Sequence, residues 1–125
     1  MEINLPAVKA EVEAAFAIYE AALVSNDVET LQRLFWDSDL TIRYGTAENL
    51  YGIQEIGAFR AARSPFGLAR TTSRTVITTF GRDFATASTL FRRSADKVGR
   101  QMQSWVRMAD GWRVVAAHVS MIEAP

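Results

Sequence analysis

The hydrophobic pattern of this chain changes once, near Pro65, and the change limits the folds open to it. Before Pro65, apolar residues recur at three- and four-residue steps, which is typical of amphipathic helices. From Ala69 onward, apolar and polar residues alternate, and threonine, valine and aromatic residues are frequent, which is typical of strands. Short turns separate the alternating segments, so we expect consecutive antiparallel pairing. The predicted strands are residues 69–79, 84–93, 98–108 and 112–121.

Three helices are expected in the first half of the chain. Residues 6–24 carry one apolar stripe, and Pro6 suits the first helical position. Asn26 lies three residues before a glutamate, which is the spacing of a capping box. It predicts a short second helix that ends near Trp36. Residues 53–63 have the pattern of a third helix.

A short strand and a hairpin are expected between the second and third helices. Residues 40–44 alternate in polarity, and two glycines bracket the return at residues 45–52. Together these elements predict one α+β domain spanning residues 1–125. In it, three N-terminal-half helices pack on a strongly curved antiparallel sheet to give a cone-shaped fold.

Composition argues against several classes of function. No apolar run reaches the roughly 18 residues of a membrane span. A net charge of zero and no recognisable nucleic-acid module disfavour a nucleic-acid partner. The chain has no cysteine and one histidine, His118, which argues against a protein-built metal site, and we expect no cofactor. The N-terminus lacks the pattern of a signal peptide, so we expect a cytoplasmic protein.

The basic residues are nearly all arginine. Of the fourteen lysines and arginines, twelve are arginine, and most of them lie in the second half of the chain. A guanidinium group binds carboxylate or phosphate through two N–H groups at once, so the excess is consistent with a small anionic ligand. The alternative explanation is the codon bias of a GC-rich genome.

Several polar side chains lie in apolar surroundings. Tyr19 is on the apolar stripe of the first helix, either as a catalytic donor or as a core tyrosine bonded to a carbonyl group. Arg43 lies in the strand at residues 40–44, either as a solvated edge residue or as an anion anchor at the mouth of a pocket. Arg60 and Arg63 share a helix face with isoleucines. Either their stems are buried and their heads reach water, or they enter a cavity from its rim.

The closing strand is mostly apolar on both faces. Strict alternation places His118 on one face with Trp112, Val114, Ala116 and Ser120. The helices can cover one face, and a second subunit is the simplest cover for the other, so we expect a homo-oligomer. On this pattern, His118 is either a proton shuttle in the site or a core or interface histidine.

Familiar catalytic machinery is missing from the sequence. It has no nucleophile elbow, phosphate loop or dinucleotide fingerprint. Ser120 is two residues from the only histidine and is a weak nucleophile candidate. Asp39 lies in a polar turn, either as a general base or, more simply, as a solvated acid. Catalysis would then use tyrosine, arginine, histidine or carboxylate groups. The candidate set is Tyr19, Arg43 and His118, with Arg60, Arg63 and Arg70 as helpers.

The order of the elements resembles the nuclear transport factor 2-like superfamily. Residues 111–120 are similar to the closing strand of its SnoaL-like members. This fold hosts isomerases, cyclases, dehydratases and binding modules, so it does not by itself define a function. Residues 58–63, 99–105 and 117–120 show a narrower resemblance, which extends over nearly the whole chain. It is to the family that contains AtzH, of cyanuric-acid catabolism, and HpxZ, of oxalurate catabolism.

This resemblance implies a hydrolase or decarboxylase that converts 1,3-dicarboxyurea to allophanate. The family's first-helix tyrosine and first-strand arginine are implicated in that activity, and these roles fall on Tyr19 and Arg43. The alternative is a non-catalytic module that binds a small anion or assists a partner amidase. The expected substrate-binding residues are Arg60, Arg63, Arg70, Trp105 and His118.

Overall fold

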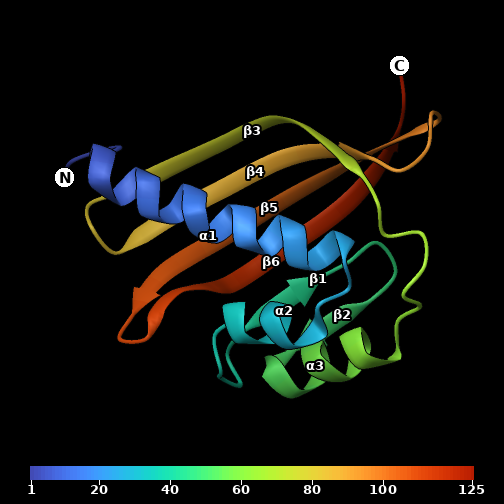
Figure 1. The fold of residues 1–125 in the computed structure, drawn as a ribbon, viewed down its shortest axis with the longest axis horizontal. Helices are drawn as coiled ribbons and strands as arrows, with labels where there is room; N and C mark the ends of the chain where they lie inside the picture. The colour runs from blue at the N-terminus through green and yellow to red at the C-terminus, as the bar shows by residue number, and fades with distance from the viewer.

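The computed structural model describes residues 1–125 as three helices and six strands (Figure 1). None of the helices combines the length and the apolar character needed to cross a membrane. The expected α+β class is confirmed, and the four long strands lie close to the predicted positions. In chain order the elements are α1 (Pro6–Val24), α2 (Val28–Leu34), β1 (Ile42–Tyr44), β2 (Asn49–Tyr51), α3 (Gly52–Ala62), β3 (Thr71–Phe80), β4 (Phe84–Arg92), β5 (Lys97–Met108) and β6 (Gly111–Glu123).

All six strands form one sheet in the order β2-β1-β6-β5-β4-β3. The long strands β3 to β6 pair antiparallel with their sequence neighbours, as expected. The sheet is mixed, however, because β1 pairs in parallel with β6, with Arg43 opposite Ala117. This pairing joins segments more than seventy residues apart. It brings the first strand beside the last and places Arg43 one strand in from the β2 edge of the sheet.

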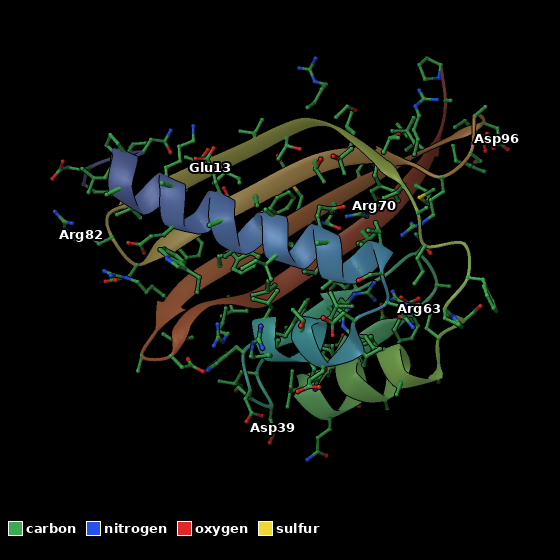
Figure 2. The ribbon with its side chains drawn as sticks, in the orientation of Figure 1. Glu13, Asp39, Arg63, Arg70, Arg82 and Asp96 are labelled. Atoms are coloured by element: carbon green, nitrogen blue, oxygen red, sulfur yellow. The ribbon has the colours of Figure 1, made fainter.

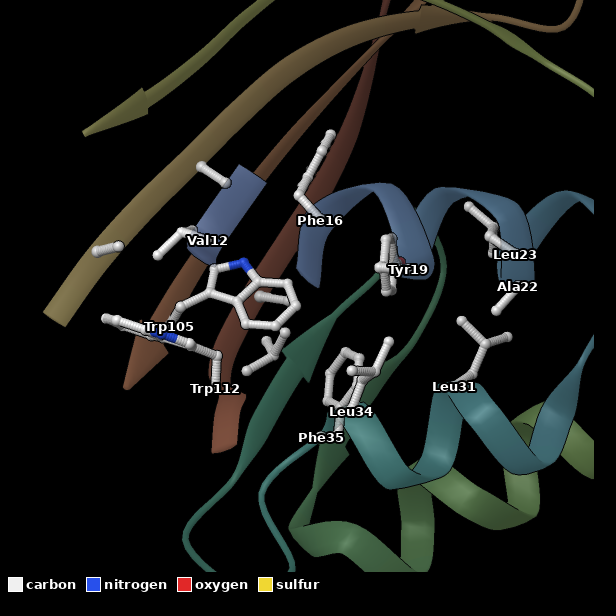
Figure 3. Packing of buried hydrophobic residues seen from close by; sticks show 14 of the residues in the cluster. Val12, Phe16, Tyr19, Ala22, Leu23, Leu31, Leu34, Phe35, Trp105 and Trp112 are labelled. Atoms are coloured by element: carbon white, nitrogen blue, oxygen red, sulfur yellow. The ribbon is translucent and has the colours of Figure 1, made fainter. Parts of the chain in front are cut away.

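The helices gather on one face and at one end of the sheet. In Figure 1, α1 crosses over the long strands, while α2 and α3 lie below it beside β1 and β2. Figure 3 shows the core that results, in which Val12, Phe16 and Tyr19 of α1 point toward residues from α2 and the sheet. Burial of such side chains is the main stabilising contribution, at about 1.5–3 kcal/mol for each fully buried large one.

The second helix begins one residue later than the capping-box pattern predicts. Asp27 is its N-cap, and its carboxylate accepts hydrogen bonds from the Thr30 backbone N at 3.1 Å and from Thr30 Oγ1 at 2.7 Å. These bonds from Thr30 lower the pKa of Asp27. Asn26 instead takes a left-handed conformation, with φ of 55°, which asparagine tolerates better than most residues. Asn26 therefore forms the turn between the two helices, and Asp27 caps the second.

Candidate functional site

A cavity of about 340 Å³ lies between the C-terminal half of α1, the β1–β2 loop, the end of α3 and the inner face of β4, β5 and β6. This volume suits a small organic molecule. Figure 2 places Arg63 and Arg70 at this end of the molecule, while Arg82 lies at the far end. The polar side chains that line the cavity are Tyr19, Arg43, Thr46, Glu48, Arg63, Arg70, Arg93 and Gln101.

Tyr19 reaches the cavity from the buried face of α1. Tyr19 is 3% exposed, and the centroid of its ring lies 6.4 Å from those of both Phe16 and Phe35. Figure 3 shows the ring pointing from α1 toward Leu34 and Phe35 of the second helix region. The apolar packing fixes the ring, so the phenolic oxygen is held in place before any ligand binds.

Arg43 reaches the same cavity from β1 and is paired with a carboxylate. Its Nη1 donates to Glu48 Oε1 at 2.9 Å, and its guanidinium stacks over the Phe59 ring at 5.2 Å. Glu48 lies across Gly45, where an added Cβ would be 1.8 Å from Glu48 Oε1. Gly45 thus leaves room for the carboxylate to reach Arg43. Because one nitrogen of the fork faces Glu48, the guanidinium has a fixed orientation.

Arg70 is held by three neighbours. Its Nε donates to Glu20 Oε2 at 3.1 Å, its Nη2 also donates to Glu20, and its Nη2 donates to Gln101 Oε1 at 3.0 Å. Its guanidinium lies 4.3 Å from the centre of the Phe91 ring. Most of its donors are therefore used inside the protein. Although Arg70 lines the cavity, its geometry fits a residue that positions others better than a primary ligand for the substrate.

Arg60 and Arg63 carry donors that lack partners. Arg60 is 1% exposed, and none of its three side-chain nitrogens has a hydrogen-bond acceptor. Its guanidinium stacks over Phe35 at 4.7 Å. Burial lowers the pKa of Arg60 to about 10; Tyr19 opposes this shift, while the charges of Arg43 and Arg63 add to it. On half-buried Arg63, Nε and Nη2 are also without partners. A buried cation without a counter-charge is costly, so its presence points to a functional role.

The cavity region has an excess of positive charge. Arg93 stacks on the Phe91 ring at 5.0 Å, on the same aromatic side chain that Arg70 contacts. Burial lowers the pKa of Arg93, and the neighbouring charges of Arg70 and Arg63 lower it further. Five guanidinium groups thus face two carboxylates, those of Glu20 and Glu48. Such an arrangement favours an anionic ligand.

His118 lies outside this site, contrary to the alternation expected for the closing strand. Ser104 pairs with Ala116 and Trp105 with Val114, so the intervening Val115 has no partner and forms a β-bulge. One extra residue reverses the faces that follow it. Trp112 remains in the core, but His118 is exposed on the outer face, where its ring lies 5.9 Å from that of Tyr44.

Two further expectations for the site need correction. Trp105 is fully buried and donates from Nε1 to Gln103 Oε1 at 3.0 Å, so it is a core residue and does not line the cavity. Figure 3 shows it beside Trp112 and Val12. Arg60 likewise lies behind the cavity wall and does not enter from the rim. The exposed Asp39 lies before β1, and Figure 2 shows it away from Arg63 and Arg70.

Five polar residues of this site were not predicted from the sequence: Glu20, Thr46, Glu48, Arg93 and Gln101. Glu20 is next to Tyr19 but off the apolar stripe, and Glu48 lies in a turn, so neither position suggested a role. Gln101 alternates with exposed residues in β5, and only the sheet register shows which way it points. Arg93 is an exposed residue just after β4 and is in no strand pairing, so the sequence pattern offers no reason to place it at the cavity. No group of three or more histidine, cysteine, aspartate or glutamate residues is arranged to hold a metal ion.

A wider groove, of about 1120 Å³, lies between α2, the start of α3 and the β5–β6 turn. Its Arg113 is occupied locally, since it donates to the backbone oxygens of Trp112 and Asp110 and pairs with the Asp110 carboxylate. The groove lacks buried cations without partners. We therefore assign the functional site to the smaller, arginine-rich cavity.

A curved sheet folded against a long helix, with a polar cavity between them, is the cone-shaped fold of nuclear transport factor 2-like proteins. The chain belongs to the AtzH-like family, which it matches over residues 1–125.

Several solved structures are similar to this chain. One is a protein of unknown function from Pectobacterium atrosepticum, with 57% identity and a TM-score of 0.94; the match covers 96% of this chain and 94% of that one. Another is a cystatin-like fold protein from Burkholderia xenovorans, with 51% identity, a TM-score of 0.95 and coverage of 100% and 99%. A nuclear transport factor 2-like protein from Pseudomonas putida has 16% identity, a TM-score of 0.76 and coverage of 91% and 86%, and shares the fold. No curated protein matches the chain.

Proposed function

We propose that this protein removes one carboxylate group from 1,3-dicarboxyurea, or from a similar small N-carboxylated urea, and produces allophanate. The observation that carries the proposal is the cluster of guanidinium groups with unpaired donors around the buried Tyr19. The substrate is inferred from the family resemblance. The excess of arginines around the cavity favours a ligand with two negative charges, as 1,3-dicarboxyurea has. The nuclear transport factor 2-like fold includes enzymes, which is consistent with a catalytic role.

In this proposal, Arg43 holds one carboxylate of the substrate, and Arg63 and Arg93 neutralise the second. The bond between that second carboxylate carbon and its urea nitrogen breaks. Its electron pair stays on nitrogen, and carbon dioxide leaves. Tyr19 donates its proton to the nitrogen and recovers a proton from water afterwards. Arg60, buried beside Tyr19, stabilises the negative charge that forms on the phenolic oxygen.

Hydrolysis is the second route to the same product. A water molecule adds to the terminal carboxylate carbon, Glu48 accepts a proton from it, and bicarbonate leaves in place of carbon dioxide. Glu48 is the candidate base because its carboxylate lines the cavity. The two routes share the roles of Tyr19 and Arg43. A cytoplasmic enzyme of this kind would work beside an amidase that consumes allophanate.

Turnover by matched variants tests the proposal. Carbon dioxide release is measured from freshly generated 1,3-dicarboxyurea, with circular dichroism to verify folding. Tyr19→Phe and Arg43→Ala should each lower the rate roughly 100-fold or more, since each removes a group that acts on the reacting atoms. Arg82→Ala, an exposed arginine at the far end of the molecule, is the control and should keep the wild-type rate.

Wild-type rates in folded Tyr19→Phe and Arg43→Ala proteins would contradict this mechanism. Binding of the substrate without any turnover by the wild type would favour the alternative, a non-catalytic anion-binding or accessory module for a partner amidase. In that case activity should appear only when the partner is added.

A further inference from the structure

Gln101 is a buried residue on the cavity wall, and the nitrogen of its side-chain amide makes no hydrogen bond. It lies on β5, is 2% exposed and lines the cavity beside Arg70. Its Oε1 accepts from Arg70 Nη2 at 3.0 Å, whereas its Nε2 has no hydrogen-bond partner. A buried amide donor without an acceptor costs free energy, so a ligand that provides an acceptor binds with an advantage.

The orientation of this amide is fixed by Arg70. A guanidinium group only donates hydrogen bonds, so the amide oxygen must face Arg70 and the amide nitrogen must face away. Arg70 is itself held by both carboxylate oxygens of Glu20 and stacks on Phe91. The chain from Glu20 through Arg70 to Gln101 therefore presents one N–H₂ donor in a fixed direction on the cavity wall.

We propose that Gln101 is a specificity-determining residue that donates to a neutral carbonyl oxygen of the ligand. The arginines of the cavity suit carboxylate groups, because charged donors bind charged acceptors most strongly. The amide N–H₂ of Gln101 is uncharged and pairs well with the neutral oxygen of an amide or urea carbonyl group. The substrate class is then a small acid in which a carboxylate and a neutral amide or urea carbonyl lie within one short molecule. This inference rests on the proposed function of the cavity.

Two stable probes compare a ureido group with an apolar group of the same shape, and the Gln101 variants assign the difference to the carbonyl oxygen. Hydantoate carries a carboxylate and a urea carbonyl, and 4-methylpentanoate has the same shape and carboxylate without the carbonyl. Binding is followed by isothermal titration or by shifts of protein NMR signals. We expect the wild type to prefer hydantoate by about fivefold, the effect of one net hydrogen bond. Gln101→Met should remove the preference while leaving the affinity for 4-methylpentanoate within about twofold.

Two more variants guard against a merely structural effect. Gln101→Glu keeps an acceptor for Arg70 but cannot donate to a carbonyl group, so it should fold and lose the preference as well. Gln103→Met changes the next inward glutamine of β5, which does not line the cavity, and should keep the preference.

The outcomes distinguish this inference from the proposed function. A hydantoate preference that survives in Gln101→Met, or equal binding of both probes by the wild type, overturns the role of Gln101 alone. If the wild type binds neither probe, the anion cavity itself is wrong and the inference falls with it.

Discussion

Arg60 is the residue whose surroundings are hardest to explain by stability. It is almost fully buried, stacks on Phe35, and has no acceptor for any side-chain nitrogen. Its lowered pKa, caused mainly by burial, means that the folded protein disfavours the charged form relative to the unfolded chain. A residue that opposes folding in this way is expected where its charge is needed, next to Tyr19.

Replacement of Arg60 should therefore separate stability from activity. We expect Arg60→Met to raise the free energy of unfolding by about 1–4 kcal/mol, since methionine fills the space without a buried charge. Turnover should fall at the same time. Urea unfolding and the carbon dioxide assay measure the two effects, with Arg82→Met as the control. If Arg60→Met were clearly less stable than the wild type, Arg60 would be a structural residue.

At the scale of elements, β4 and β5 together build an aromatic support for the arginines. Phe91 of β4 pairs with Gly99 of β5, and an added Cβ on Gly99 would lie 2.1 Å from Phe91 Cζ. The ring can occupy this position only because Gly99 has no side chain. Arg70 and Arg93 both stack on the Phe91 ring. The positions of these two guanidinium groups therefore depend on the missing side chain of Gly99.

A methyl group at Gly99 should push the ring away. We expect Gly99→Ala to lower the free energy of unfolding by about 1–3 kcal/mol, the usual cost of overpacking. In a Phe91→Leu background the same change should cost less, because the clash is smaller. Urea unfolding of the four proteins gives this cycle. Equal costs in both backgrounds would show that Phe91 and Gly99 are not coupled in this way.

Sequence periodicity predicts the elements well and their faces less well. The helices and long strands follow from local patterns, and Tyr19 and Arg43 stand out because each is polar in an apolar setting. The bulge at Val115 has no signature in the sequence, so alternation places His118 on the wrong face. The position of Gln101 also depends on cross-strand register, which is set by residues far apart in the chain.

At the scale of the whole molecule, the outer face of the sheet carries exposed apolar side chains. Val76 is 57% exposed and Met102 54%. The strand pairing places Val76, Ser88, Met102 and His118 in one row across the sheet, so all four lie on the same face. Exposed apolar side chains that lie together on one face are typical of an interaction surface. The predicted homo-oligomer would cover this face with a second copy of the chain.

Sedimentation tests the oligomer. We predict a dimer at micromolar concentration, and Met102→Glu should weaken it at least tenfold by placing a charge in the interface. Ile18→Glu, on the exposed side of α1, is the matched control and should leave the dimer intact. A wild-type protein that sediments as a monomer at micromolar concentration would contradict the prediction.

The most direct test of the proposed activity is to incubate the wild-type protein with freshly generated 1,3-dicarboxyurea and to measure both carbon dioxide and ammonia. Allophanate retains both nitrogen atoms of the substrate. We therefore predict carbon dioxide well above the spontaneous rate, in equal amount to the allophanate formed, and no ammonia. Carbon dioxide release at only the spontaneous rate would contradict an enzyme built on Tyr19 and Arg43.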